Sequence, residues 1–365
     1  MAVSAVDISR YAPRFDIAIN GAPVGADGLH AITSVEIEQQ LNRMNMFRFQ
    51  VQDEYAPGGA PGQGRARPFR WLGHPLFTFG NDVSVSIGYV HLVKMAEGKI
   101  QNIQADFTHG LAPTFSVDGA DRAFMFLTTP SDVAAFRDKT DSDIAKEIAD
   151  RAQMDAVVDR TSERFAVKIK QGGKSYFEFL DELARCNGYN FSLSGRRLNF
   201  VAPTANRPAD AVLTWGQDVL SFSPQLKTDA IFTEVIVRAW DRSGRQMIEG
   251  RARAGEENQQ EPGKRFGSQV AQGIYGEAVK VITDRPVTSA AEARQIALAE
   301  LQRGSDSFIA GTVEMLGRPD LGPGMTMELR GLGDWFSGKY FIDKLTHRIS
   351  TSGYRTSCEI KRNAL

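Results

Sequence analysis

The sequence predicts an α+β fold that is predominantly β, with two β-domains flanking a small module of helices and a hairpin. Two-residue alternation of apolar and polar residues dominates the first third of the chain and returns from residue 212 onward. Between these regions the apolar period lengthens to near 3.6 residues, as helices require. Because 365 residues are too many for one ordinary core, we predict domains at 1–129, 130–207 and 208–365.

The first domain opens with a predicted β-hairpin. Residues 15–24 alternate in polarity and contain Asn20-Gly21, the dipeptide that two-residue hairpin turns favour. Residues 56–68 are rich in glycine and proline, and we expect a flexible loop there because β patterning resumes directly afterwards. Further strands are expected at 32–37, 47–51, 83–87, 98–107 and 114–117.

The middle module contains two well-marked helices. Thr140 precedes an amphipathic segment with acidic residues in its first turn, which complement the helix dipole. Ser175 and Glu178 form a capping box, and Asn187-Gly188 supplies a residue that tolerates positive φ at the helix end. A hairpin with Ser194-Gly195 at its turn should follow.

The last domain is predicted to be mainly β. A strand is expected at 231–240, a long polar loop near 252–273, and one helix near 289–303 that opens at Ser289 and Glu292. Residues 324–360 also repeat, in outline, the strand and glycine pattern of residues 80–117, with Gly338-Lys339 matching Gly98-Lys99. A true repeat would place two similar β-domains around a helical insert.

A cluster of polar residues near the C-terminus raises the question of catalysis. Nucleophile-and-base sites use these side-chain types, but they need residues converging from different elements, and no GxSxG motif occurs here. We interpret the cluster as strand and turn residues, with a hydrolase site as the alternative. Its members are Asp334, Ser337, Asp343 and His347.

Composition argues against several other function classes. The formal net charge is -1, so no global field draws the chain to nucleic acid or to anionic membrane. Cys186 and Cys358 form no CxxC pair, the five histidines are scattered, and no phosphate-binding loop is present, so we predict no metal and no cofactor. We also expect no secretory signal, no membrane insertion and no specific nucleic-acid binding.

Three segments together carry a family resemblance. They are GKSYFEFLDELARCNGYNFSLSGRRLNFVAP, RPVTSAAEARQIALAELQR, and the stretch from GRPDLGPGMTMELR through FSGKYFIDKLTHRIS to TSCEIKR. In this order they resemble the phage late control protein D family, the baseplate hubs of contractile phage tails. That family is related to the first part of type VI secretion VgrG spikes and to hubs of extracellular contractile injection systems.

The resemblance implies a structural hub without catalytic or cofactor residues. Each chain of a homotrimer would contribute two β-barrel domains similar to tail-tube subunits, and six such domains would match a hexameric tube above a trimeric spike. Expected partners are the chain itself, the tube protein, a separate spike protein and other baseplate proteins. We expect the protein in a virion tail baseplate or phage-tail-like particle assembled in the bacterial cytoplasm.

Interface residues are harder to predict than the fold. Apolar and aromatic positions near predicted strand ends are plausible interface anchors, and simple burial is the alternative for each. These positions are Trp71, Leu72, Trp335 and Phe336. A tail-associated cell-wall or glycan hydrolase and a carbohydrate-binding module remain alternative functions.

Overall fold

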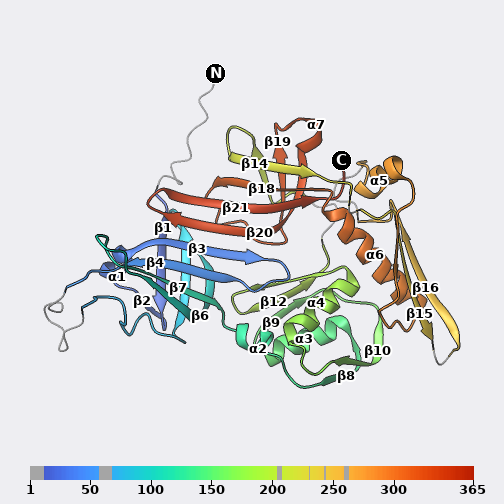
Figure 1. Cartoon of the computed structure of the whole chain (residues 1–365), viewed down its shortest axis with the longest axis horizontal. Coiled ribbons are helices and arrows are strands. Elements are labelled where there is room, and N and C mark those ends of the chain that lie inside the picture. The colour runs from blue at the N-terminus through green and yellow to red at the C-terminus, as the bar shows by residue number, and fades with distance from the viewer. Residues whose placement is uncertain (1–11, 57–67, 204–207, 230, 242–243, 259–262) are drawn as a thin grey trace.

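The computed structural model describes residues 12–56, 68–203, 208–229, 231–241, 244–258 and 263–365. Its main feature is one 13-stranded sheet, and a helical module and a second small sheet lie beside it (Figure 1). The predicted loop at 56–68 falls almost wholly outside the described residues.

The first half of the large sheet is built by the N-terminal third of the chain. The predicted hairpin turn is confirmed, with φ of 52° at Asn20 and 80° at Gly21, the positive values of a type I′ turn. Helix α1 (Ala26–Ala31) follows the hairpin. The strands are β1 (Arg14–Ile19), β2 (Ala22–Pro23), β3 (Ile32–Gln40), β4 (Met46–Gln52), β5 (Asp82–Gly88), β6 (Leu92–Asp106) and β7 (Thr114–Asp121).

The second half of the large sheet is built by residues from the C-terminal part of the chain. A short helix, α7 (Gly333–Phe336), precedes the last two strands of this half. The strands are β13 (Ala211–Thr214), β14 (Val219–Leu226), β18 (Ile309–Leu316), β19 (Thr326–Arg330), β20 (Gly338–Ser350) and β21 (Gly353–Arg362).

The two halves share one strand order. In the first half the hydrogen-bonded path runs β1-β5-β6-β7-β4-β3, and in the second it runs β13-β19-β20-β21-β18-β14. Numbered by order along the chain within each half, both paths read 1-4-5-6-3-2. One difference is that β1 pairs antiparallel with β5, whereas β13 pairs parallel with β19.

Two β-bulges fall at equivalent places in the two halves. The β6–β7 pairing shifts register between Ile100 and Asn102, and the β20–β21 pairing shifts between Ile342 and Lys344. The β3–β4 and β14–β18 pairings shift likewise, at Ile32/Ser34 and Val219/Ser221. Because bulges are specific local features, two coincident bulges support the predicted repeat.

The bulges also correct the alignment of that repeat. When the two halves are aligned at these bulges, Ile100 corresponds to Ile342. Gly98 then corresponds to Tyr340 and not to Gly338. The glycine-lysine match seen in the sequence is therefore wrong by two residues, although the strand correspondence holds.

Strands β3 and β20 join the two halves into one sheet. β20 pairs with β19 through its first residues and with β3 through residues 344–350, so that one edge of β20 carries two neighbours in succession. At this joint Val35, Ile37, Leu345 and His347 are fully buried. Backbone pairing closes no barrel within the described residues, and the halves are two parts of an open, continuous sheet.

The middle module contains a buried cluster of its own. Both helices begin with reciprocal capping boxes, at Thr140/Asp143 and Ser175/Glu178, and Gly188 ends the second with φ of 66°. The elements are α2 (Phe124–Thr128), β8 (Ala134–Thr140), α3 (Asp141–Arg151), β9 (Asp155–Val158), β10 (Arg164–Lys170), α4 (Tyr176–Asn187), β11 (Asn190–Ser194) and β12 (Arg197–Val201).

Along the chain, a further unit is inserted between β14 and β18. Helix α6 (Ala290–Asp306) covers one face of a three-stranded sheet made of β15 (Glu234–Asp241), β16 (Gln246–Arg253) and β17 (Val279–Ile282). Helix α5 (Gly267–Tyr275) occupies part of the predicted polar loop. The prediction missed α5 because buried tertiary contacts hold it: Gly267 lies against Phe308, and Phe266 pairs with Ala364.

Among the described helices, none is long and apolar enough to cross a membrane.

Protonation of His347 makes the stability of this fold depend on pH. Its ring is fully buried at the β3–β20 joint, where Nδ1 lies 3.1 Å from the Thr356 hydroxyl and 2.9 Å from the Tyr354 hydroxyl. Loss of hydration lowers its pKa from 6.5 to about 4, and the Asp320 charge opposes this shift only in part. Because the unfolded chain binds this proton more readily, His347 favours the fold fully above pH 6.5 and disfavours it as the pH falls toward 4.

We therefore predict that His347→Gln weakens the acid sensitivity of the fold. Between pH 7.5 and pH 5 the wild type should lose about 2 kcal/mol more unfolding free energy than the variant. Urea unfolding at the two pH values measures this difference. Asp121, whose pKa burial raises to about 7, contributes with the opposite sign in both proteins and cancels. An equal loss in both proteins would contradict the assignment.

Candidate functional site

The four polar residues of the C-terminal stretch do not assemble into a catalytic site. The Ser337 hydroxyl accepts a hydrogen bond from the Leu332 backbone, and His347 is enclosed in the sheet. Asp343 forms an ion pair with Lys361 at 2.8 Å, and Asp334 lies in α7. Nucleophile, base and orienting group therefore do not converge. Asp343 and His347 are strand residues, as interpreted, whereas Asp334 lies in a short helix that the interpretation did not predict. In the part of the chain that the structure describes, no group of three or more His, Cys, Asp or Glu side chains could hold a metal ion.

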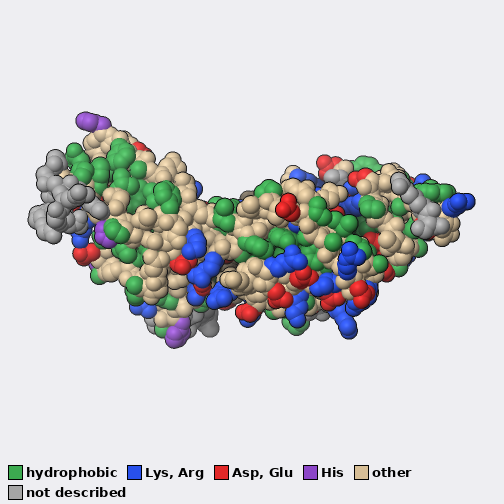
Figure 2. All heavy atoms as spheres, turned by 90° about the horizontal axis from the view of Figure 1, so that it is seen from below, with side chains coloured by type: hydrophobic (Ala, Val, Ile, Leu, Met, Phe, Trp, Pro, Cys, Tyr) green, Lys and Arg blue, Asp and Glu red, His purple; other side chains and the backbone are tan. Residues whose placement is uncertain are grey.

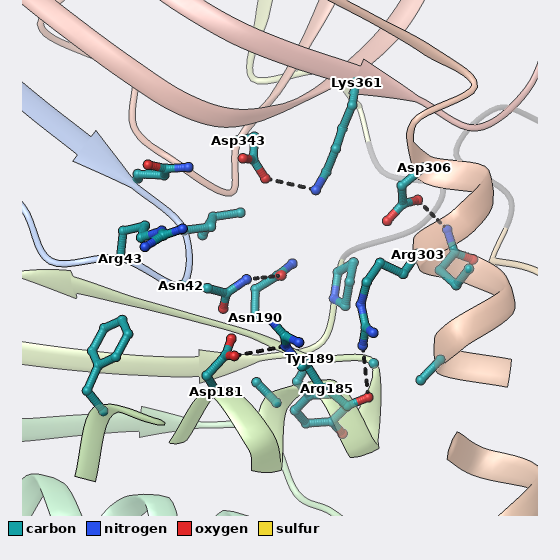
Figure 3. Close-up of a pocket in the computed structure, with 18 residues that line it drawn as sticks. Asn42, Arg43, Asp181, Arg185, Tyr189, Asn190, Arg303, Asp306, Asp343 and Lys361 are labelled. Atoms are coloured by element: carbon teal, nitrogen blue, oxygen red, sulfur yellow. Dashed lines mark hydrogen bonds and ion pairs between the residues drawn. The ribbon is translucent and has the colours of Figure 1, made fainter. Parts of the chain in front are cut away.

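A polar cavity lies where the large sheet, the middle module and α6 meet (Figure 3). Its volume is about 350 Å³. Figure 3 shows side chains from β20 and β21 on one wall, from α6 on another, and from α4 and the β3–β4 turn on the rest. The labelled lining residues are Asn42, Arg43, Asp181, Arg185, Tyr189, Asn190, Arg303, Asp306, Asp343 and Lys361.

Charges in this cavity are largely balanced by each other. Arg185 pairs with Asp181 at 2.8 Å, and Gln302 donates to Asp306 at 2.6 Å. Burial opposes the charge on Lys361, but Asp306 and Asp343 outweigh it and raise the lysine pKa. These pairs each lie within one unit, and the units are linked by the hydrogen bonds of Asn42 with Asn190 at 3.1 Å and of Arg303 with the Arg185 carbonyl at 3.2 Å.

One face of the 13-stranded sheet is polar across the β3–β20 joint. Directly paired positions share a face, so Glu36, Arg48 and Asp118 on three neighbouring strands project together, as do Thr346 and Ser357. A hollow of about 460 Å³ lies against this face. Its lining includes Ser34, Glu36, Arg48, Gln50, Gln104, Ser116 and Arg348.

Acidic and basic side chains alternate on this polar face. Arg48 pairs with Asp118 at 2.6 Å, and Lys344 pairs with Glu38 at 2.9 Å. The molecular surface seen from below also shows basic and acidic groups side by side, without a field of one sign (Figure 2). The surface is therefore hydrated and nearly neutral, consistent with the overall charge of -1.

Among the open strand edges of the large sheet, besides those of β2 and β13, are the edge of β14 and that of the second part of β6. β14 pairs with β18 along its length, apart from a bridge between Val219 and Trp215 at its start, and β6 beyond Ile100 pairs with β7, so residues 101–106 have an open edge in the described structure. Apolar groups lie along both edges: Phe222 and Leu226 are half-buried, and Phe107 is 59% exposed. Open edges with apolar side chains are sites for strand pairing.

The predicted interface anchors occupy different environments. Trp71 is buried in the first core, and Leu72 and Phe336 are partly buried against the first and second cores. Trp335 is 63% exposed, and Trp215 near the neighbouring turn at Gly331 is 48% exposed. The structure thus brings Trp335 to the surface with a second tryptophan that sequence reasoning missed.

The open edges were also missed by sequence reasoning. Strands at 98–107 and from 212 onward were expected, but an alternating pattern does not show which strands pair. Pro224 was a usable signal, because proline in a strand indicates an edge.

Comparison with solved structures shows a fold found in phage tail proteins. The chain is similar to the 43 kDa tail protein of prophage MuSo2 from Shewanella oneidensis, with a TM-score of 0.71, 15% identity, and coverage of 96% of this chain and 98% of that chain. It is also similar in fold to a tail protein from Neisseria meningitidis MC58, with a TM-score of 0.70, 15% identity, and coverage of 96% of this chain and 97% of that chain.

A component of the E. coli type VI secretion system has a related fold. The TM-score is 0.55 at 13% identity, with coverage of 94% of this chain and 76% of that one. That protein is described as similar in structure to the T4 bacteriophage tail proteins gp27 and gp5. At these identities the likeness is one of fold.

A search of curated proteins finds no match. The family model that matches differs in name from the late control protein D family expected from the sequence. It is described as the Alg8 N-terminal domain, a description that states no activity, and it matches residues 10–351. Since this match extends over most of the sequence, the chain belongs to the Alg8 N-terminal domain family.

Proposed function

We propose that this protein is a structural baseplate hub that joins a hexameric tail tube to a trimeric spike. The particle would be a contractile phage tail or a phage-tail-like injection system. The observation that carries the proposal is the duplicated six-strand unit, with one strand order and coincident bulges in both halves. The fold neighbours among phage tail and type VI secretion proteins support it.

Duplication suits a protein that connects two symmetries. Three copies of a chain with two similar units give six quasi-equivalent units, which match a sixfold tube, while the whole chains retain threefold symmetry. Each unit would serve as a tail-tube-like β-domain, and the merged sheet would form part of a ring wall.

The polar sheet face is the best candidate for the lining of a central passage. A hydrated surface of paired charges gives a passing chain no apolar patch and no one-signed field to bind. The partners would be the tube protein, a separate spike protein and other baseplate proteins, assembled in the bacterial cytoplasm. Among the predicted anchors, exposed Trp335 would contact a partner, while Trp71, Leu72 and Phe336 would support that surface from within.

The first test is composition of the assembly. The purified chain should have a solution mass of three times 40.2 kDa, and purified particles should contain it at the junction of tube and spike. Light scattering and electron microscopy of the particle measure these properties. A stable monomer that is absent from particles would refute the hub assignment.

The second test addresses the rival hydrolase. We expect no clearing of peptidoglycan in a zymogram by the wild type, because Asp343 and His347 are held in the sheet and do not converge on a nucleophile. Lysozyme serves as the positive control. Clearing that disappears in Asp343→Ala or His347→Ala would establish an enzyme in place of the hub.

A further inference from the structure

We infer that β14 of one copy pairs with residues 101–106 of β6 in the next copy, and that three such joints close a ring of three chains. This inference rests on the proposed trimeric hub and adds the surface that assembles it. The occupant of each open edge is thus a second copy of the same chain.

The joint within the chain is the template for the joint between chains. By strand order and bulge position, β20 corresponds to β6 and β3 corresponds to β14. Strands β20 and β3 pair with each other inside the chain, whereas the corresponding edges of β6 and β14 are both open in the described structure.

The template also fixes the register. Inside the chain Leu345 lies opposite Gln39 and Thr346 lies opposite Glu38. In the alignment set by the bulges, Leu345 and Thr346 correspond to Ile103 and Gln104, and Gln39 and Glu38 correspond to Leu226 and Gln225. The same register between copies pairs Ile103 with Leu226, and Gln104 with Gln225, of the next copy. The strands run antiparallel in both cases.

Side chains at the internal joint are buried, whereas the corresponding side chains at the two open edges are more exposed, as expected if those edges have no partner in the free chain. Ile349 in the internal joint is 4% exposed, while Phe107 at the corresponding place is 59% exposed. Val35 is fully buried, while its counterpart Phe222 is only half-buried. Forming the second joint would remove both aromatic rings from water, which favours association.

Backbone groups point in the required directions. Leu41 donates to Asp343 across the internal joint, so the alternate residues Gln39 and Ile37 also face β20. Lys227 donates to Phe308 on the opposite side, which turns the backbone groups of Leu226 and Pro224 toward the open edge.

Pro224 makes the second joint weaker than the first. It corresponds to Ile37 but has no N–H, so one hydrogen bond of the template is absent between chains. Proline on an edge protects an unpaired strand from indiscriminate pairing. The edge can therefore remain exposed in the free chain and still pair in one register.

The contact joins two different surfaces, so repetition must either close a ring or continue as a filament. The duplicated unit offers one internal and one external joint per chain. A ring of six units contains three of each.

Paired cysteines test both register and closure. Gln104 and Gln225 would form a non-hydrogen-bonded pair, with Cα atoms about 4.5 Å apart, within the range for a disulfide. On mild oxidation, the purified full chain carrying Gln104→Cys and Gln225→Cys should give covalent dimers and trimers and no larger species on denaturing gels.

Matched variants control this experiment. Thr346→Cys with Glu38→Cys occupies the equivalent internal pair and should form a disulfide without a mass increase. Gln104→Cys with Ser221→Cys is out of register and should not crosslink. The single variants measure the background from the native Cys186 and Cys358.

The outcomes separate this inference from the hub assignment. A trimer mass without the crosslink, or equal crosslinking out of register, would overturn the pairing and leave the hub in place. Species beyond three chains would overturn closure of the ring. A monomer in solution would overturn both.

A second variant removes one backbone donor from the same joint. In the template register the Ala105 N–H faces the open edge, so Ala105→Pro should leave the β6–β7 pairing intact. We expect the dissociation constant of the trimer to rise at least tenfold, because each of three joints loses a hydrogen bond. The urea midpoint of the chain should stay unchanged; unchanged assembly would overturn the inference.

Discussion

The antiparallel pairing of β3 with β20 is the constraint on which the rest of the structure depends. It connects residues 34–40 to residues 344–350, near the two ends of the chain, and makes two similar sheet halves continuous. The polar face runs across this joint without interruption, and the cavity between the modules lies beside it, where Asp343 and Lys361 pair. A change that opened this pairing would separate the two halves and their shared surface.

The repeated unit is preserved in pairing more than in side chains. Ile37 and Pro224 are equivalent, as are His347 and Ala105, yet within each pair the residues have different chemistry. Ile37 and His347 belong to a joint that forms once and stays buried. Pro224 and Ala105 lie on edges that meet water in the free chain. The same strand geometry therefore forms a permanent joint between β3 and β20 within the chain and, in our proposal, a reversible joint between β14 and β6 of neighbouring chains.

Local signals in the sequence predicted much of the fold. The Asn20-Gly21 turn and the caps at Thr140, Ser175 and Gly188 are confirmed, because each depends on residues adjacent in the chain. The strand order also follows the predicted repeat, although the glycine match was wrong by two residues. The β3–β20 joint, α5 and the open edges were not predicted, because distant partners determine them and alternation alone does not reveal strand pairing.

The two insertions occur once in each chain, whereas the sheet unit occurs twice, and this makes the two halves of the chain different. Along the chain, the middle module follows β7 and separates the two units, and the sheet of β15–β17 with α6 is inserted between β14 and β18. Figure 1 shows β15, β16 and α6 projecting to one side of the paired strands β14 and β18. In the first unit the equivalent connection, between β3 and β4, is only a short turn at residues 41–45. The two insertions contact each other, since Gly188 approaches Ala299 and Arg303 donates to the Arg185 carbonyl. Each chain thus carries two similar sheet units and one unrepeated helical feature, so an assembly of three chains can be nearly sixfold in its sheets while remaining threefold in its insertions.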